Sequence, residues 1–370
     1  MLKLANLCKK LKINRKRIFL NKRKVLFLIL NEYIYSMKVL KIITALALAF
    51  SIAFTAFYGR YKIESSGVDT TPEQYKGVIT MWQMDVFEGG KGSRKQFLLK
   101  AARSFEKSNS GVLIMVIDQT IEGAKESIKN GKYPDLISFG VGFDISGFSE
   151  LSVDRKVVGG MVGDKCFAAA WCRGGYALIS NPLLVSELEN VTQIDNLLVS
   201  QAEYTQPLVS LAFDGIRAKN VEVLSPMDAY VKFVSGKTPY FLGTQRDVNR
   251  LINRGFEFSL RPLAEYNDLY QYVCITGKDQ LKRFYSEKFI AHLLSDGVQN
   301  SLVEIGMYSP YVNLDYGVNE HISMQKAAAK STISAFITGS QLKEMQELSL
   351  RAATGDEQAL NKIKNMCVMP

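Results

Sequence analysis

The sequence predicts an α/β protein with two domains, and three observations support this prediction. Short apolar runs with strand character alternate with helix-like segments along most of the chain, a pattern typical of a doubly wound sheet. Several of these runs lead into glycine-rich or polar loops. The pattern restarts after Asn181-Pro182, and 370 residues of globular composition, 47% of them hydrophobic, are enough for two domains.

The opening unit of the pattern is a strand, a polar loop and a helix. The loop contains three glycines, which let the backbone turn sharply and approach another molecule closely. Ser93 followed by Gln96 fits a capping box, so the helix should begin at about Arg94 and run to 108. A strand end that meets a helix N-terminus is where open α/β sheets present ligand sites.

The other elements are predicted from apolar periodicity and from breaks at glycine and proline. Strands are expected at about 78–82, 112–117, 134–140, 165–170, 176–180, 208–213 and 269–276. Further helices are expected at about 122–130, 183–188, 226–235, 244–253, 278–294 and 295–302. The tail from 319 to 366 should be mostly helical, with a break at Gly355.

The basic excess of the chain lies in its N-terminal segment. The formal net charge is +10, but residues 1–62 contain 14 Lys and Arg against one acid, Glu32, and so carry +13. The remaining residues carry −3. The part of the chain with a folded pattern therefore gives no case for nucleic acid as a partner.

An apolar run from Ile42 to Tyr58, preceded by Lys38 and Lys41, has the character of a secretory signal peptide or a single membrane anchor. Its basic flank predicts that everything after about Arg60 is exported to the extracellular face of the cytoplasmic membrane. Cleavage of the segment is left open. A buried core helix is the alternative, but such a helix does not need so basic a leader.

The first 36 residues are basic and have few turn residues. Met37 begins a more natural signal-peptide start. We therefore hypothesise that translation begins at Met37. The alternative is a basic cytoplasmic tail. Residues 37–60 would then be the signal peptide or anchor, and the polar residues 61–76 would link it to the fold.

The sequence gives no indication of a metal or cofactor site. Four cysteines, Cys166, Cys172, Cys274 and Cys367, follow the apolar run at wide spacing, and the chain has two histidines. Neither zinc nor copper is expected from this pattern. Buried free thiols are favoured over a disulfide between Cys166 and Cys172.

Familiar catalytic and nucleotide-binding motifs are absent from the sequence. The stretch 89–93 lacks the residue order of a phosphate-binding loop, and there is no dinucleotide fingerprint or nucleophile elbow. His292 and His321 have no catalytic context. Asp85 with Glu88 is a possible pair for glycoside hydrolysis, because the separation of such carboxylates is spatial and cannot be read from sequence.

Several loops combine aromatic and polar side chains in a way that suits carbohydrate. A sugar ring stacks its C–H face on an aromatic side chain, while its hydroxyls bond to planar polar groups. These loops lie at 82–94, 138–143, 171–176, 243–247, 270–272 and 307–311. The alternative for each aromatic is ordinary packing, and Arg246 with Asp247 is alternatively an ion pair at a helix start.

The chain resembles the extracellular solute-binding proteins of carbohydrate ABC importers, which are related to maltose-binding protein. The resemblance covers about residues 77–366 and rests on five segments, namely Trp82 to Arg94, Tyr133 to Gly140, Trp171 to Asn181, Gly243 to Asp247, and Phe289 to Gln299 with Ile305 to Pro310. Two features depart from the family. The chain has no lipobox cysteine after the apolar run, and no clear Pro-Thr-Trp-Asp helix start follows the first crossing strand.

The resemblance implies a two-lobed, periplasmic-binding-protein-like (type II) fold, with ligand in the cleft between lobes that close by hinge motion. Lobe 1 is expected at 77–178 and 270–310, and lobe 2 at 181–267 and 311–370. The resemblance also implies a carbohydrate ligand, an ABC permease as partner and membrane contact through the N-terminal apolar segment. No cofactor and no catalysis are expected.

Ligand contacts are expected from the polar–aromatic loops of both lobes. The residues are Trp82, Asp85, Glu88 and Arg94 in the first loop, Arg173 and Tyr176 near the hinge, Gln245 and Arg246 in the second lobe, and Tyr270 and Tyr308. Two other functions stay open on sequence alone. One is a membrane-tethered receptor that feeds a sensor kinase, and the other is a secreted carbohydrate-active enzyme.

Overall fold

The computed structural model describes residues 75–144, 147–185 and 188–367, together with Thr44. The chain divides into two compact units, residues 1–71 and 72–370. The predictions for the basic leader, the apolar segment Ile42–Tyr58 and most of the linker lie outside the described residues. Among the residues that are described, no helix is both long enough and apolar enough to span a bilayer.

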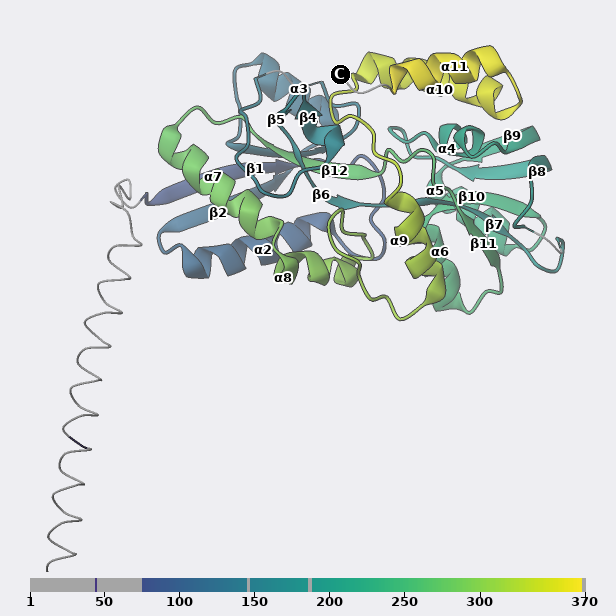
Figure 1. Cartoon of the computed structure of the whole chain (residues 1–370), viewed down its shortest axis with the longest axis horizontal. Coiled ribbons are helices and arrows are strands. Elements are labelled where there is room, and N and C mark those ends of the chain that lie inside the picture. The colour runs from purple at the N-terminus through teal and green to yellow at the C-terminus, as the bar shows by residue number, and fades with distance from the viewer. Residues whose placement is uncertain (1–43, 45–74, 145–146, 186–187, 368–370) are drawn as a thin grey trace, which may run out of the picture. The chain divides into compact units, whose positions relative to one another are not determined.

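The first sheet of the second unit has the strand order β2-β1-β3-β12-β6 (Figure 1). Strand β1 (Gly77–Gln83) pairs in parallel with β2 (Val112–Asp118) and β3 (Leu136–Gly140), whereas β12 (Tyr270–Ile275) runs antiparallel to β3 and to β6 (Ala169–Arg173). Helices α2 (Arg94–Ser108) and α7 (Gln280–Leu293) pack against this sheet and each other, and α3 (Ile121–Lys129) joins β2 to β3. The short elements η1 (Val158–Gly160), β4 (Met161–Val162) and β5 (Lys165–Cys166) precede β6.

The second sheet has the strand order β11-β7-β10-β8-β9. Its parallel strands are β8 (Gln193–Ser200), β9 (Arg217–Leu224) and β10 (Tyr240–Thr244), and β7 (Tyr176–Ser180) runs antiparallel to β10 and to β11 (Ser259–Pro262). The helices along this part of the chain are α4 (Pro207–Phe213), α5 (Pro226–Val234) and α6 (Gln245–Arg254). In each sheet, four strands thus run in one direction and one runs against them, namely β12 in the first sheet and β7 in the second.

Three described segments cross between the two sheets. The first joins β6 to β7 through Gly174 and Gly175, and the second joins β11 to β12. The third follows α8 (Asp296–Asn300) and η2 (Ser301–Ile305) and leads to α9 (Asn319–Ala328), which packs on β7, β11 and α6. The predicted two-lobed α/β fold is therefore confirmed.

The C-terminal helices α10 (Gly339–Ala353) and α11 (Glu357–Met366) pack on each other and on α4 (Figure 1). The predicted break between them is at Gly355, whose φ of 108° favours glycine. The N-cap prediction for the first helix is also confirmed, because the Ser93 hydroxyl accepts a hydrogen bond from the Gln96 backbone N–H (3.3 Å) and α2 begins at Arg94.

Two predicted elements are wrong, and the sequence analysis missed four strands of the second sheet, β8, β9, β10 and β11. Residues 208–213 form helix α4 and not a strand. Their short run is apolar on every side, so periodicity cannot separate a buried strand from a buried helix. Pro207 at the first helical turn costs no hydrogen bond there, and α4 is covered by α10 and α11. Residues 182–184 form a turn where a helix was expected.

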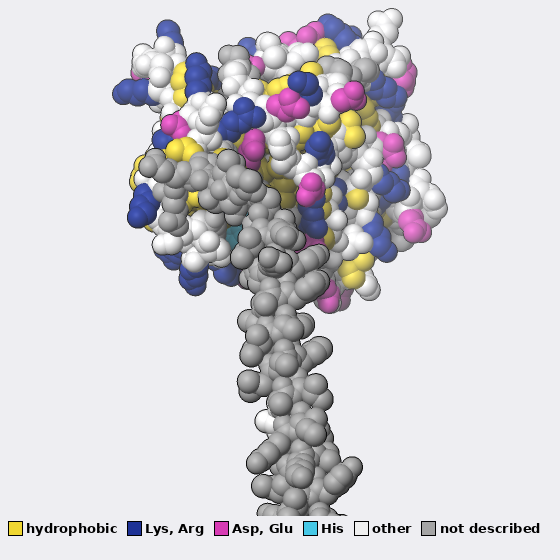
Figure 2. All heavy atoms as spheres, turned by 60° about the vertical axis from the view of Figure 1, so that its left-hand side comes forward, with side chains coloured by type: hydrophobic (Ala, Val, Ile, Leu, Met, Phe, Trp, Pro, Cys, Tyr) yellow, Lys and Arg dark blue, Asp and Glu magenta, His cyan; other side chains and the backbone are white. Residues whose placement is uncertain are grey.

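The cysteines in the described part of the chain are free thiols, as the sequence favoured. Cys166, Cys172 and Cys274 are buried, and Cys367 is half-buried. Within the same residues, no group of His, Cys, Asp and Glu side chains is arranged to hold a metal ion. On the face shown in Figure 2, basic and acidic side chains of the described residues are interspersed.

Candidate functional site

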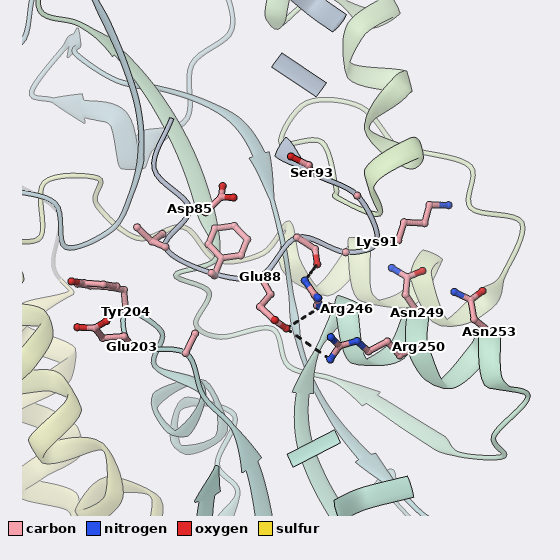
Figure 3. Close-up of a pocket in the computed structure, with 16 residues that line it drawn as sticks. Asp85, Glu88, Lys91, Ser93, Glu203, Tyr204, Arg246, Asn249, Arg250 and Asn253 are labelled. Atoms are coloured by element: carbon pink, nitrogen blue, oxygen red, sulfur yellow. Dashed lines mark hydrogen bonds and ion pairs between the residues drawn. The ribbon is translucent and has the colours of Figure 1, made fainter. Parts of the chain in front are cut away.

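A pocket of about 850 Å³ lies where loops of the two sheets face each other (Figure 3). It is lined by residues 85–93 after β1, residues 202–204 after β8, and four residues of α6, namely Arg246, Asn249, Arg250 and Asn253. Both loops follow the carboxyl end of a parallel strand, which is where open α/β sheets present ligand sites. The volume is in the range of pockets that take small ligands.

The loop at 85–93 is held in place by Arg94, whose side chain is only 1% exposed. Its Nε lies 2.8 Å from the Asp85 carboxylate, its Nη1 donates to Gln271 Oε1 (3.2 Å), and its Nη2 donates to the Phe87 carbonyl. The guanidinium also lies 4.2 Å from the centre of the Phe87 ring. Arg94 therefore positions the loop from beneath and does not line the pocket.

Gly90 allows this loop to pack directly on another backbone segment. A Cβ atom at Gly90 would lie 1.9 Å from the Gly306 carbonyl oxygen. Beside it, the Lys91 N–H donates to the Ile305 carbonyl (3.0 Å). The glycine loop was expected to approach another molecule closely. In the structure, the backbone that it approaches belongs to this chain, at the end of η2.

The two lobes are joined across the pocket by charged side chains. The Glu88 carboxylate lies 3.0 Å from Arg246 Nε and 3.9 Å from Arg250 Nη1. The Arg246 guanidinium also donates to the Gly89 carbonyl (3.3 Å). On the other side, the Tyr204 hydroxyl donates to Glu122 (2.8 Å). The contacts of Glu88 and Gly89 hold the first-lobe loop against the second lobe, and the Tyr204 contact joins the second lobe to α3.

Helix α6 presents a polar stripe to the pocket because of its spacing. Its buried residues Val248 and Leu251 face the core, and residues three and four positions apart share the opposite face. Thr244 caps the helix in a capping box with Asp247, whose carboxylate accepts from the Thr244 N–H (2.9 Å). Burial raises the pKa of Asp247 to about 6. The carboxylate nearest Arg246 is Glu88, so Arg246 and Asp247 do not pair with each other.

Of the ten residues proposed from sequence, Asp85, Glu88 and Arg246 line this pocket. Trp82 lies in β1, 7% exposed, and does not line it. Five others, Arg173, Tyr176, Gln245, Tyr270 and Tyr308, are buried in or beside the crossings between lobes. The structure thus brings three of the ten together at one surface.

The buried residues at the crossings make hydrogen bonds that fix the connecting segments. The Tyr176 hydroxyl donates to Asp268 (2.6 Å), and burial raises the pKa of that carboxyl to about 6. The Gly175 N–H donates to Gln245 Oε1 (3.0 Å). Arg173 reaches the Tyr270 hydroxyl (3.4 Å). These side chains position the crossings where the lobes meet.

Tyr308 is connected to the pocket through a histidine. Its hydroxyl is 2.7 Å from His321 Nδ1, and His321 Nε2 is 2.9 Å from Asn249 Oδ1. Since Asn249 Oδ1 can only accept, Nε2 carries the proton and Nδ1 accepts from Tyr308. Burial lowers the pKa of His321 to about 4, so this histidine is neutral at neutral pH.

The pocket residues that were not proposed from sequence include Lys91, Glu203, Tyr204, Asn249, Arg250 and Asn253. Helical spacing from Arg246 would have identified the three on α6. Glu203 and Tyr204 follow β8, a strand the sequence analysis missed, so nothing marked them as a loop at a strand end.

The fold is similar to those of solved sugar-binding proteins. The sugar-binding protein MalE from Xanthomonas citri matches with a TM-score of 0.57 at 14% identity, over 79% of this chain and 96% of that chain. The GacH receptor of Streptomyces glaucescens, solved unliganded and with acarbose, matches with a TM-score of 0.53 at 12% identity, over 79% and 99%. The ABC substrate-binding protein Lmo0181 from Listeria monocytogenes, in complex with cycloalternan, matches with a TM-score of 0.53 at 11% identity, over 79% and 98%.

The sequence matches no protein-family model and no curated protein. The structural matches nevertheless extend over nearly the whole length of the three proteins. This chain therefore has the two-lobed fold of these sugar-binding proteins.

Proposed function

We propose that this protein is an extracytoplasmic solute-binding protein, which captures a sugar or oligosaccharide between its lobes and delivers it to an ABC transporter permease. The observation that supports this function best is the 850 Å³ pocket between the lobes, lined by polar side chains from both. The solved proteins with the same fold are a sugar-binding protein, a receptor and an ABC substrate-binding protein, and the last two were solved with acarbose and with cycloalternan.

The proposed lobes follow the two sheets. Residues 77–178 and 270–310 would form lobe 1, and residues 181–267 and 311–370 lobe 2, except that β7 (Tyr176–Ser180), in which the first boundary falls, belongs to the second sheet. The apolar segment Ile42–Tyr58 would direct export and, if uncleaved, tether the protein at the extracellular face of the cytoplasmic membrane.

In the proposed site, Asp85, Glu88 and Arg246 contact the ligand, together with the six pocket residues found only in the structure. Carboxylates and amides can bond to sugar hydroxyls in pairs, and Tyr204 offers an aromatic ring in the same pocket. The seven other residues proposed from sequence would act indirectly, by holding the first loop and the crossings. Opening of the lobes would break the Glu88 ion pairs, and ligand would enter before the lobes close.

Ligand binding should stabilise the protein in a screen of mono- and oligosaccharides. A saccharide at about 100 times its dissociation constant is expected to raise the free energy of unfolding by about 2.7 kcal/mol, because it binds only the folded state. Thermal unfolding with each sugar, followed by calorimetry for those that shift the midpoint, measures this.

A matched pair of variants locates the effect. Arg246→Gln should weaken the shift because it removes a pocket donor, whereas Arg254→Gln, exposed on the same helix and outside the pocket, should not. Stabilisation by amino acids or polyamines without any carbohydrate would overturn the proposed ligand class. Release of shortened sugars during the incubation would show an enzyme instead.

A further inference from the structure

We infer that the saccharide taken by this pocket carries an acidic group, such as the carboxylate of a uronic acid residue, which lies against Arg246 and Arg250. This inference rests on the proposed function and specifies the class of sugar. It is carried by the distribution of charge in the pocket, by the position of Glu88 and by donors that have no acceptor.

The pocket has two chemically different ends (Figure 3). Lys91, Arg246 and Arg250 lie at one end with the amides of Asn249 and Asn253, and Asp85, Glu203 and Tyr204 lie at the other. Asp85 is already neutralised by Arg94 at 2.8 Å. A ligand with an anionic group at one end and hydroxyls along the rest would match both ends.

Glu88 supplies the negative charge at the basic end. It is the one carboxylate among the pocket-lining residues that lies within 4 Å of Arg246 or Arg250. It reaches them from the opposite lobe, so its carboxylate leaves when the lobes part. Guanidinium groups bind planar carboxylates with directed hydrogen bonds. The Glu88 carboxylate therefore occupies the position that we assign to the acidic group of the ligand.

Two donors at this end make no hydrogen bond in the described structure. Asn249 is 91% buried, and its Oδ1 is engaged by His321, yet its Nδ2 has no hydrogen-bond partner. Arg250 Nη1 is also buried without a hydrogen bond, since Asp247 and Glu88 lie 3.7 and 3.9 Å away. Buried donors without hydrogen-bond acceptors are costly. A ligand group made of acceptors alone would satisfy them once the lobes part and these atoms become accessible.

Calorimetry with paired sugars tests this inference. Oligomers of galacturonate, glucuronate and mannuronate are each compared with the neutral, carboxyl-reduced oligomer of the same linkage. At least one acidic oligomer should bind about tenfold or more tightly than its neutral partner, a difference of about 1.4 kcal/mol. The difference should shrink as salt is added. A 6-phosphosugar in the same series separates a site for carboxylates from a site for phosphates.

Variants assign the effect to the basic end. Arg250→Gln and Arg246→Gln should each lower the affinity for the acidic oligomer about tenfold and change that for the neutral oligomer much less. Arg254→Gln makes the same charge change on the same helix outside the pocket and should alter neither. Glu88→Gln should strengthen binding of the acidic oligomer several-fold, because it removes an anion that competes for the two guanidinium groups.

The outcomes separate this inference from the proposed function. Neutral oligomers that bind as tightly as the acidic ones would overturn the inference and leave the function in place. Weaker binding of the acidic oligomer by Glu88→Gln would show that Glu88 does not compete with it, and would also overturn the inference. Binding of neither oligomer class would overturn both.

Discussion

Replacement of Arg94 by Met is expected to lower the free energy of unfolding by about 3 kcal/mol. Met keeps much of the side-chain volume but offers no donors. The buried Phe87 carbonyl and Gln271 Oε1 would each lose their hydrogen bond, and an unsatisfied buried acceptor costs about 1–3 kcal/mol. Urea unfolding, followed by circular dichroism, measures the change. Since the same residue holds Asp85 and Phe87, the variant should also bind sugar more weakly.

Lys95→Met is the matched control for this prediction, because it removes a cation from the next position of the same helix. Lys95 pairs with Asp118 at 2.9 Å, but both side chains are partly or largely exposed. Exposed pairs contribute about 0–1 kcal/mol. Equal destabilisation by the two substitutions would contradict the role given to Arg94, because it would show that burial of the guanidinium does not matter.

His321 should make the protein less stable in acid by about 3 kcal/mol. Its pKa falls from 6.5 to about 4 on folding because it is buried. Between these pH values the unfolded chain binds a proton at His321 that the folded chain does not. The free energy of unfolding is therefore highest above pH 6.5 and falls as pH drops towards 4. Burial raises the pKa values of Asp247 and Asp268 to about 6, which has the opposite effect on stability. What these two carboxyls add to the free energy of unfolding is lost as pH rises through 6.

Because His321 and the two carboxyls change the stability in opposite directions with pH, the prediction compares the wild type with a variant that lacks His321. The stability of the wild type minus that of His321→Gln should be about 3 kcal/mol larger at pH 7 than at pH 4. Urea unfolding at several pH values tests this. NMR titration gives a direct second measurement, since the chain has only two histidines and His292→Gln assigns the other. Parallel stability curves, or a His321 midpoint near 6.5, would contradict the prediction.

Local signals in the sequence determined the fold class, most helices and most of the first sheet, whereas of the second sheet only β7 was predicted. The Ser93 cap, the apolar runs that became β1, β2 and β3, and the glycine at the α10–α11 break each act within a few residues, so they can be read along the chain. The loop at 82–94 was also identified as a candidate ligand loop, and residues 85–93 of it line the pocket.

What the sequence could not determine was the direction and surroundings of single side chains. Its place in the first loop predicts Arg94 as a ligand residue, but Gln271, 177 residues away, accepts a hydrogen bond from it and helps to hold it beneath that loop. Likewise, residues 208–213 form a helix that packs against α10 and α11. A short apolar run does not show which distant elements will pack on it, so its sequence alone does not separate helix from strand.

The sequence by itself therefore determined most elements of the first sheet, the two-lobed α/β fold and the loop that lines the pocket, but not the strands β8 to β11 of the second sheet. The tertiary structure alone decided that Glu88 meets Arg246 and Arg250, and that Trp82, Tyr270 and Tyr308 are buried away from that pocket. The physical reason is that hydrogen bonding and periodicity within an element are local, whereas burial and charge pairing depend on which distant segments the fold brings together.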